Sequence, residues 1–381
     1  MKVTVHRGAL VEVLALASGV VPARSPKPVL GCVKLSTVET PNGKALRVLS
    51  TDNEIALETT LAQCDVKREG SVLLPASKLL EIINNSPDDT VVIDSDAQKT
   101  TIKGSDSKFV LLGYNPEEFP PISGFEGTAD VDISAGMLKA LLDRSRFAAA
   151  KEMSRYAING VMFERKGRRL TLVATDGHRL ALAKEDLPVE GPDFSNVVPI
   201  KAITLIERLL TDPEQKVELQ FRENRLFARV SHGGDGDKKP TVATAVLSTV
   251  LVEGVFPNYN DVIPKDSDRK ATLKCERFAS AVRRASLLTN EESKGVKLSF
   301  QAKELVLSSR AAEVGEATVE MPIELHGEPL DIGFNPQYLQ DALKVCPTED
   351  VTLDLKTANK PGILRSGHNF LYVIMPVSLN L

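Results

Sequence analysis

An internal repeat constrains this chain more than any other feature of its sequence. Three segments share one order of features, namely an amphipathic helix, a basic turn and a glycine that leads into an apolar strand. They are Gly8–Leu35, Gly136–Glu164 and Arg277–Phe300. The glycines at the strand entries are 129 and 135 residues apart, which is close to a third of the 381-residue chain. The sequence therefore predicts three domains built on one plan.

A second shared pattern follows the first in each third of the chain. It consists of a strand, a proline or polar cap, a short helix, an acidic turn and another strand, and it begins at Ser71, Asn196 and Ile332. Proline and serine favour the first turn of a helix, and Pro-Asp or Pro-Thr dipeptides end one. Each repeat thus contains two helices, and the short connections between its strands predict antiparallel sheets and an α+β fold.

Each repeat also contains a predicted hairpin between the two patterns. Ala45–Leu61 and Arg169–Leu187 align on the dipeptides Asp52-Asn53 and Asp176-Gly177. Such dipeptides, flanked by alternating apolar residues, favour two-residue turns. The third copy, Glu304–Met321, keeps the strands but has lost the aspartate turn.

Two stretches rich in turn-forming residues separate the repeats. They are Phe119–Gly127 and Val262–Lys270. We therefore expect domains at residues 1–128, 129–266 and 267–381.

Composition and charge exclude several classes of protein. The 47 Lys and Arg against 51 Asp and Glu give a net charge of −4, which excludes a uniformly basic nucleic-acid-binding surface. The four cysteines form no Cys-x-x-Cys pair, so scattered buried thiols in a reducing cytosol are favoured over zinc or redox motifs. Leu10–Val21 contains Glu12 and is too short to span a bilayer, and no signal-peptide pattern precedes it. We expect a cytoplasmic protein with no membrane partner.

Positive charge is concentrated in the predicted helices and the turns that follow them. These segments carry a net charge of +8, and the rest of the chain carries −12. The helix faces are either merely solvated or all directed at one polyanion, and the repetition favours the second alternative. Such a surface would bind phosphates without reading bases, because the sequence shows no zinc finger, no convincing recognition helix and no run of stacking aromatic residues.

Ala174–Leu182 is the one stretch that resembles a catalytic site, since it places Asp176, His178 and Arg179 within four residues. A type I′ turn with His178 and Arg179 pointing outward explains it most simply. Catalysis would need a third partner, and the sequence has no nucleophile elbow, phosphate loop or metal-type histidine spacing. As a third alternative, the turn forms one wall of a binding groove. We therefore expect no catalysis, no metal and no cofactor.

The C-terminal segment Phe370–Leu381 is an apolar strand followed by a largely apolar tail. Tails are usually polar and frayed, so this one is expected to dock on its own domain or at a partner site. Docking as a core strand is the default expectation.

Four motifs resemble the bacterial sliding clamp family, the β subunit of DNA polymerase III. They are ATDGHRLA from Ala174, EGVFPNYNDVIP from Glu253, FNPQYLQDAL from Phe334 and YVIMPV from Tyr372. The resemblance covers essentially the whole chain. It implies a head-to-tail homodimer of three-domain protomers, a ring lined by helices that encircles double-stranded DNA without sequence specificity. The ring would tether the replicative polymerase and so confer processivity, with no catalytic step.

The resemblance also implies a groove between the second and third domains. This groove would take short apolar peptides from the polymerase catalytic subunit, the clamp loader, other polymerases and mismatch-repair proteins. The matching groove positions are Ile158, Thr175, Gly177, His178, Arg179, Leu180, Pro257, Val262, Asn335, Tyr338, Val373, Met375, Pro376, Val377 and Leu379. Positions that match DNA-binding residues are Arg24, Lys78, Arg155, Tyr156 and Lys201. At the ring interface, Phe109 and Leu111 match one face, and Leu287 and Leu288 match the other.

The chain departs from the family pattern at several positions. Asn260-Asp261 stand where the family often has two arginines, and Ser378 stands where an arginine is common. Ala157 replaces a second aromatic residue beside Tyr156, and Ser77 stands where a basic residue can occur. These departures affect partner affinity and single DNA contacts. Two other functions remain as alternatives: a scaffold of the same repeats that does not bind DNA, and a hydrolase that uses the turn at Asp176.

Overall fold

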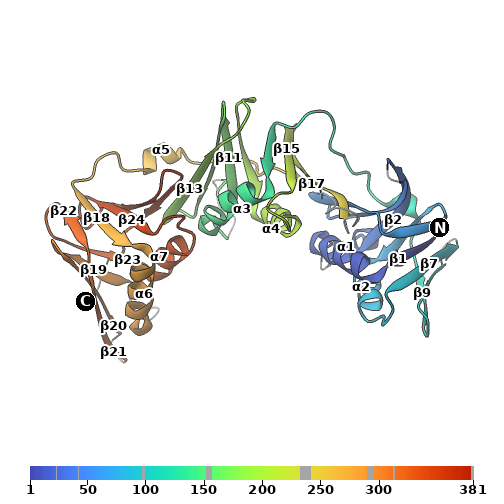
Figure 1. Cartoon of the computed structure of the whole chain (residues 1–381), viewed down its shortest axis with the longest axis horizontal. Helices are drawn as coiled ribbons and strands as arrows, with labels where there is room; N and C mark the ends of the chain where they lie inside the picture. The colour runs from blue at the N-terminus through green and yellow to red at the C-terminus, as the bar shows by residue number, and fades with distance from the viewer. Residues whose placement is uncertain are drawn as a thin grey trace. The chain divides into compact units, whose positions relative to one another are not determined.

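The computed structural model describes most of the chain, and its described residues form two compact units. The described residues are 1–22, 24–41, 43–96, 99–151, 157–231, 242–289, 295–311 and 314–378. The first unit combines Met1–Lys139 with Lys201–Leu251, and the second combines Ala140–Ile200 with Val252–Leu381 (Figure 1). The middle third of the chain therefore contributes to both units.

The order of elements confirms the predicted threefold repeat. The first repeat contains β1 (Lys2–His6), α1 (Arg7–Val20), the 3-10 helix η1 (Pro28–Gly31), β2 (Cys32–Thr40), β3 (Gly43–Thr51), β4 (Ile55–Leu61), β5 (Cys64–Arg68), β6 (Ser71–Pro75), α2 (Ala76–Asn84), β7 (Thr90–Asp96), β8 (Lys99–Lys103) and β9 (Lys108–Leu112), followed by η2 (Pro116–Glu118). The second contains β10 (Val131–Ser134), α3 (Ala135–Asp143), η3 (Arg146–Ala148), β11 (Gly160–Lys166), β12 (Arg169–Thr175), β13 (Arg179–Asp186), β14 (Phe194–Pro199), α4 (Ile200–Leu209), β15 (Lys216–Arg222), β16 (Arg225–Ser231) and β17 (Val242–Val250), followed by α5 (Tyr259–Val262). The third contains β18 (Arg269–Lys274), α6 (Cys275–Ala285), η4 (Ser286–Leu288), β19 (Val296–Phe300), β20 (Glu304–Ala311), β21 (Gly315–Pro322), β22 (Glu324–His326), β23 (Leu330–Phe334), α7 (Pro336–Leu343), β24 (Asp350–Leu355), β25 (Gly362–Ser366) and β26 (Phe370–Ile374). The first and third repeats have the same element order, and the second has one strand fewer before its second helix.

All strand pairings of the described residues are antiparallel, as the short connections predicted. The first unit has a five-stranded sheet, β5-β1-β7-β8-β9, and an eight-stranded sheet, β10-β15-β16-β17-β4-β3-β2-β6. The second unit has a nine-stranded sheet, β14-β11-β12-β13-β26-β25-β24-β18-β22, and a four-stranded sheet, β21-β20-β19-β23. The eight-stranded sheet crosses from the first repeat to the second through β4 and β17, and the nine-stranded sheet crosses from the second to the third through β13 and β26.

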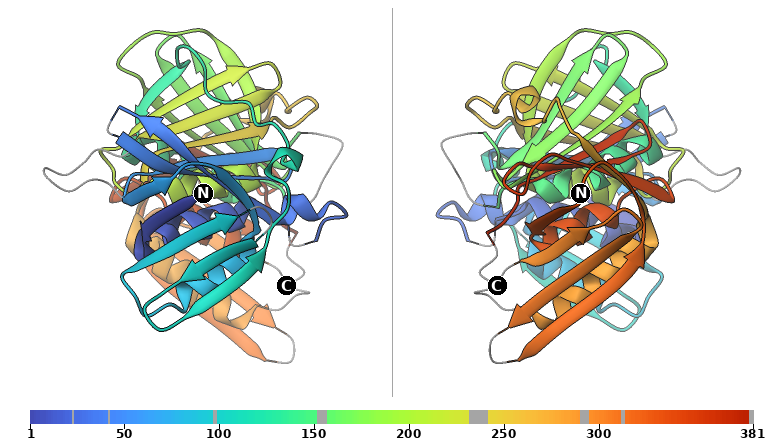
Figure 2. Two further views of the ribbon diagram at one scale, coloured as in Figure 1. Left: turned by 90° about the vertical axis from the view of Figure 1, so that its right-hand side faces the viewer. Right: turned by 90° about the vertical axis from the view of Figure 1, so that its left-hand side faces the viewer.

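Among the described residues, the strands β9 and β21 lie at sheet edges and each pairs along one side only. β9 ends the five-stranded sheet, and β21 ends the four-stranded sheet (Figure 2). On β9, the side chains of Phe109, Val110 and Leu112 are 43, 53 and 67% exposed. A long apolar edge is a template for pairing with another strand. These two edges are therefore candidate association surfaces.

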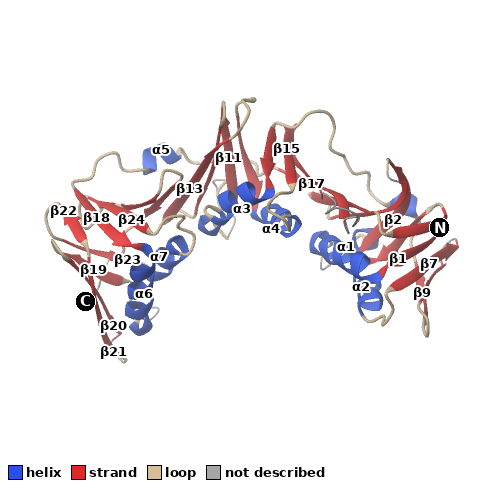
Figure 3. Cartoon of the chain, viewed as in Figure 1, coloured by secondary structure: helices blue, strands red, loops and turns tan. Residues whose placement is uncertain are grey.

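The longer helices form because each presents one apolar stripe to the core. α1 and α2 pack side by side in the first repeat, and α6 and α7 do so in the third (Figure 3). α6 buries Phe278, Ala281, Val282 and Ala285, which recur at the spacing of one helix face. Burying a side chain as large as phenylalanine contributes about 1.5–3 kcal/mol. This packing leaves the opposite, charged face of α6 in solvent.

The C-terminal strand β26 is a core strand, which confirms the default expectation. It lies between β13 and β25 in the nine-stranded sheet, and Tyr372, Val373 and Ile374 are buried. The chain then leaves the sheet, and the backbone N–H of Met375 donates to the carbonyl oxygen of His178 at 2.9 Å. No helix of the described residues is long and apolar enough to cross a membrane.

Candidate functional site

The tips of the hairpins β3–β4 and β12–β13 carry the same set of hydrogen bonds. Thr51 and Thr175 each donate a side-chain hydrogen bond to the carbonyl oxygen four residues on and accept one from the N–H two residues on. Asp52 and Asp176 each accept two further backbone N–H groups, at 2.7 to 3.1 Å. The aligned Thr-Asp pairs of the sequence are thus equivalent at atomic detail.

These loops are longer than the two-residue turns that the sequence predicted. Each contains three residues, 52–54 and 176–178. A type I′ turn needs two residues with positive φ, but each loop has only one, Asn53 at 79° or Gly177 at 89°. The prediction was wrong because the aspartate side chain organises the turn itself, as Asx turns do.

Asp52 binds the second repeat within the first unit. Its Oδ2 lies 2.5 Å from Nζ of Lys201 in the first turn of α4. The neighbouring strands β4 and β17 pair at the same junction. Lys201, which was predicted to contact DNA, is therefore already paired with a carboxylate, although its side chain is 51% exposed.

Arg179 binds the third repeat within the second unit, at the equivalent hairpin tip. Its Nε donates to Asp176 Oδ2 at 2.9 Å, its Nη1 to Asp341 Oδ2 at 2.7 Å and its Nη2 to the carbonyl oxygen of Phe147 at 2.9 Å. The guanidinium also lies 4.3 Å from the ring centroid of Tyr338 on α7. The side chain of Arg179 thus connects β13 to the 3-10 helix η3 and to the helix α7.

The expectation that Arg179 points outward was wrong. Its side chain is only 9% exposed. Burial alone would lower the pKa of Arg179, but the hydrogen bonds to Asp341 and Asp176 outweigh it, and the pKa is raised. The guanidinium is therefore a permanent charge that holds two carboxylates together.

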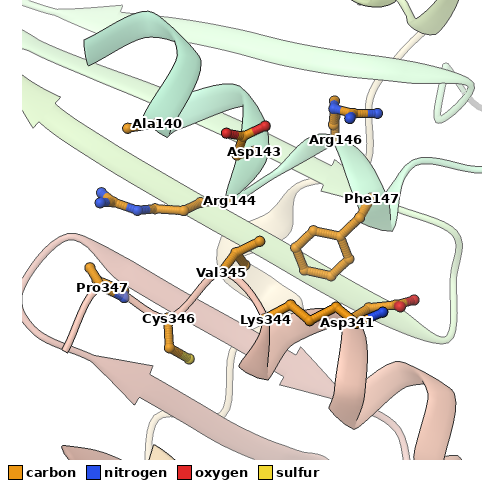
Figure 4. Close-up of a pocket in the computed structure, with 10 residues that line it drawn as sticks. All are labelled: Ala140, Asp143, Arg144, Arg146, Phe147, Asp341, Lys344, Val345, Cys346 and Pro347. Atoms are coloured by element: carbon orange, nitrogen blue, oxygen red, sulfur yellow. The ribbon is translucent and has the colours of Figure 1, made fainter. Parts of the chain in front are cut away.

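Sequence reasoning missed the partners of this arginine. Asp341 and Phe147 were not singled out, and both line a cavity of about 480 Å³ (Figure 4). Asp341 lies within the motif FNPQYLQDAL, but nothing in the sequence pairs it with a residue 162 positions earlier. The full lining is Ala140, Asp143, Arg144, Arg146, Phe147, Asp341, Lys344, Val345, Cys346 and Pro347.

An apolar cluster lies beside this junction. Leu180 and Val373 are opposite each other on β13 and β26, and both are buried. Phe256, Tyr259 and other residues of the segment between the second and third repeats pack against them. The hydroxyl of Tyr259 donates to Glu164 Oε2 at 2.7 Å, and burial together with this carboxylate raises the pKa of Tyr259 to about 12.

The structure brings together only part of the predicted groove. The hairpin residues Gly177 and His178 are exposed, and the backbone of Met375 is bonded to His178. The hydroxyl of Tyr372 donates a hydrogen bond to the backbone carbonyl oxygen of Tyr338 and so fixes the position of Tyr338. Ile158, Thr175, Leu180 and Val373 are buried; Asn335, Pro257, Pro376 and Val377 are partly exposed; and Leu379 lies outside the described residues.

Val262 lies at a separate hollow of the second unit. Its side chain is 42% exposed and lines a cavity of about 360 Å³ with Ile363 of β25. Ile363 is the sheet neighbour of Val373. Met375, 38% exposed, follows the same strand as Val373. The cavity beside Val262 is thus connected to the end of β26 through the paired strands β25 and β26.

The residues predicted to contact DNA fall into three groups. Arg24 is exposed in the loop after α1. Lys78 on α2 and Lys201 on α4 are ion-paired, Lys78 with Glu81 at 2.8 Å. Arg155 and Tyr156 lie outside the described residues.

The four predicted interface residues are accessible on two elements. Phe109 and Leu111 lie on the edge strand β9, where Phe109 is 43% exposed. Leu287 and Leu288 lie on η4, where Leu287 is 74% exposed and Leu288 is partly exposed. A leucine as exposed as Leu287 is available to bury apolar area in an association.

The positive charge lies beside the helices more than on them. The seven α-helices of the described residues carry eight Lys and Arg against seven Asp and Glu. The predicted excess therefore sits mainly in the turns, as at Arg24 and Lys27. α6 is the exception, because Arg277, Arg283 and Arg284 all lie exposed on it.

The geometry of Asp176 argues against the hydrolase alternative. One of its oxygens accepts two backbone N–H groups, and the other accepts the Nε–H of Arg179. None of these three bonds comes from the His178 imidazole, so the contact that would orient His178 as a general base is not found among the described residues. Among the described residues, no group of three His, Cys, Asp or Glu could hold a metal ion.

Comparison with known proteins connects this arrangement to one family. Three models of the DNA polymerase III beta subunit match the chain in order: the N-terminal domain over residues 1–123, the central domain over 132–258 and the C-terminal domain over 260–378. The beta sliding clamp of Pseudomonas putida is 33% identical over 383 residues, and that of Escherichia coli is 27% identical over 382, with complete coverage of both chains in each case.

Solved structures agree with these matches. The DNA polymerase III subunit beta of Pseudomonas aeruginosa has a TM-score of 0.88 at 31% identity, with 99% of this chain and all of that one covered. The sliding clamp of Bacillus subtilis has a TM-score of 0.90 at 26% identity, with 99% of each chain covered. The chain therefore belongs to the DNA polymerase III beta subunit family, the beta sliding clamps, which are non-catalytic factors that confer processivity on a DNA polymerase.

Proposed function

We propose that two copies of this chain, each with domains at 1–128, 129–266 and 267–381, close head to tail into a ring around double-stranded DNA. One observation carries the proposal. The second hairpin strand of the first repeat pairs with the last strand of the second, and that of the second repeat pairs with the last strand of the third. The third equivalent pair is β21 with β9, and both are edge strands within their own sheets.

The two internal junctions also give the expected register of the third. Ile55, the first residue of β4, lies opposite Thr249 near the end of β17, and Arg179 lies opposite Ile374 at the end of β26. Because Thr249 is the last residue but one of β17 and Ile374 is the last of β26, Gly315 should lie opposite Leu111 or Leu112 of a second copy. A head-to-tail contact gives a closed ring when the rotation that relates one copy to the next returns to the start. We propose that two copies, with six repeats in all, complete this ring.

Retention on DNA tests the ring directly. Clamps loaded on nicked circular DNA should stay bound through gel filtration and should be lost after the circle is linearised. Encirclement requires this result, because weak phosphate contacts alone let a ring slide off an end. Equal retention on the two forms would refute topological binding and favour a scaffold that binds by surface contacts.

The DNA contacts are proposed to come from the exposed cations at the helices. Family membership implies DNA and a DNA polymerase as partners. Arg24, Lys78, Arg155, Tyr156 and Lys201 remain the predicted contacts, and the exposed arginines of α6 extend the set. No ion pair with these arginines is found among the described residues. They are thus better placed to meet a phosphate than a lysine already bound to a carboxylate.

Arg24→Ala is expected to weaken DNA binding by the same factor for every sequence and to lower the slope of log K against log salt by about 1. Lys201→Ala should lower the slope less, because Asp52 already neutralises this lysine. The slopes are measured by fluorescence anisotropy over a salt series. Lys166→Ala, at the last residue of β11 and 68% exposed, is the control and should change nothing. A loss that depends on DNA sequence would contradict a sliding mode.

The partner groove is proposed to lie at the end of β26, next to the tip of the β12–β13 hairpin. Met375 and Val262 supply exposed apolar surface there, and His178 and Gly177 supply an exposed, well-fixed turn. Apolar anchors with few polar contacts suit an extended peptide with leucine and phenylalanine side chains. Such peptides would come from the polymerase catalytic subunit, the clamp loader, other polymerases and mismatch-repair proteins.

Met375→Ala, or deletion of residues 375–381, is expected to weaken peptide binding by about 1–3 kcal/mol while the dimer stays intact. The peptide would lose an adaptable apolar contact. A fluorescent Gln-Leu-x-Leu-Phe peptide, titrated against both variants and the unmodified protein, measures the difference. Val189→Ala removes a residue that is 72% exposed elsewhere and serves as the control. Equal affinities for all the proteins would place the groove elsewhere.

A further inference from the structure

Two of the four cysteines meet at the end of α7, although they are 71 residues apart in the sequence. Cys275 is the first residue of α6, and Cys346 follows α7. The Cys275 thiol donates to the carbonyl oxygen of Leu343 at 3.5 Å, and the Cys346 thiol donates to that of Ala342 at 3.4 Å. The two thiols therefore lie close together, because they donate to the carbonyl oxygens of two successive residues in the last turn of α7.

The two neighbouring thiols are unequal. Interaction with Cys346 lowers the pKa of Cys275, and the same interaction together with burial raises the pKa of Cys346. The thiolate is the reactive form of cysteine. Cys275 is thus the better nucleophile of the pair, and Cys346 is positioned next to it.

Both thiols are within reach of a small molecule. Each is partly exposed, and Cys346 lines the cavity of about 480 Å³ beside Arg144 and Lys344 (Figure 4). Arg144 acts to lower the pKa of Cys346, but the interaction with Cys275 and burial outweigh it. Cys32 differs in each respect, because it is buried and burial raises its pKa to about 11.

We propose that Cys275 and Cys346 are an oxidation site that closes to a disulfide by exchange with a low-molecular-weight disulfide, RSSR. The Cys275 thiolate attacks one sulfur of RSSR, forms a mixed disulfide and releases RS⁻. Cys346, once its proton has passed to solvent or to RS⁻, attacks Cys275 Sγ and releases the second RS⁻. The protein loses two electrons and two protons, and RSSR gains them as two RSH.

The disulfide would enclose most of the third repeat. The loop from residue 275 to residue 346 contains α6, η4, α7 and the strands from β19 to β23. A cross-link across a long loop restricts the unfolded chain and so stabilises the folded one. The oxidised form should therefore resist unfolding of this repeat more than the reduced form. This inference does not depend on the proposed ring or groove.

Peptide mapping of the full-length protein tests the proposal. The protein is incubated with oxidised glutathione, alkylated and digested. We expect one cross-linked peptide pair, Cys275 with Cys346, while Cys32 and Cys64 stay open to alkylation after denaturation. The midpoint of thermal unfolding should rise by at least about 3 °C and return after reduction. Glutathione adducts without a cross-link, or two unmodified thiols at 275 and 346, would overturn the site.

Two variants separate the roles of the thiols. In Cys346→Ser, a glutathione adduct should accumulate on Cys275, because no neighbouring thiol resolves it. In Cys275→Ser, a glutathione adduct on Cys346 should form more slowly than the adduct on Cys275 forms in Cys346→Ser. The double variant Cys32→Ser, Cys64→Ser is the matched control and should form the cross-link as the unmodified protein does. An adduct placed mainly on Cys346 would reverse the assignment and refute it, and the map of the unmodified protein decides the pairing even if a variant folds poorly.

Discussion

Replacing Leu287 by Ala and Leu288 by Asp is expected to convert the dimer into monomers. Leu287 is 74% exposed in one copy, and the proposed ring buries it with Leu288 against Phe109 and Leu111 of the other. Burying each large apolar side chain contributes about 1.5–3 kcal/mol, and the ring contains two such interfaces. Aspartate adds the cost of placing a charge in an apolar contact. Sedimentation velocity at micromolar concentration measures the outcome.

A matched control tests whether the loss of the dimer depends on where the aspartate is introduced. Val189 is 72% exposed in the loop between β13 and β14, away from the proposed interface. Val189→Asp should leave the dimer unchanged. If the leucine variant stays dimeric, η4 is not part of the interface, and the assignment of Leu287 and Leu288 is refuted. A monomeric unmodified protein would refute the ring itself.

Arg179→Ala is expected to lower the free energy of unfolding by about 2–4 kcal/mol, because it leaves two carboxylates without their shared cation. Asp176 and Asp341 are only 17 and 21% exposed, so water compensates for the loss incompletely. The substitution also removes the stacking contact with Tyr338. Urea denaturation followed by circular dichroism measures the change.

Two further variants separate charge from geometry at this position. Arg169→Ala breaks an Arg–Asp pair in which both side chains are more than half exposed, and it should lower the free energy of unfolding much less than Arg179→Ala does. Arg179→Lys keeps the charge but cannot bond Asp176, Asp341 and the Phe147 carbonyl oxygen as one planar group, so it should recover only part of the loss. Equal effects of Arg179→Ala and Arg169→Ala would mean that the buried junction contributes no more than a surface pair.

The threefold repeat could be predicted because its signals lie in short segments of the sequence. The glycines at the starts of β2, β11 and β19 and the short helices α2, α4 and α7 recur in order, and each signal depends on neighbouring residues only. Strand direction followed from short connections. The Thr-Asp pairs at residues 51–52 and 175–176 also aligned correctly, because their hydrogen bonds span no more than four residues.

The contacts between repeats could not be predicted in the same way. Arg179 turns inward because Asp341 and the Phe147 carbonyl oxygen lie beside the hairpin once β13 and β26 are paired, and no local signal encodes that pairing. The match between Lys201 and Asp52 has the same origin. Sequence spacing likewise separated Cys275 from Cys346, which the antiparallel packing of the third repeat brings together.

The aspartate at the hairpin tip has a consequence for how the proposed ring comes apart. Asp52 and Asp176 tie each repeat to the next inside the chain, through Lys201 and through Arg179. The third hairpin lacks this aspartate in sequence, and its strand β21 is the one left for a second copy. All the junctions of the proposed ring therefore use paired strands, but the two within each copy add an ion pair from the hairpin tip, whereas those between copies depend on strand edges and apolar side chains alone. Opening the ring would then separate the junctions between copies and leave the ion pairs at Asp52 and Asp176 intact.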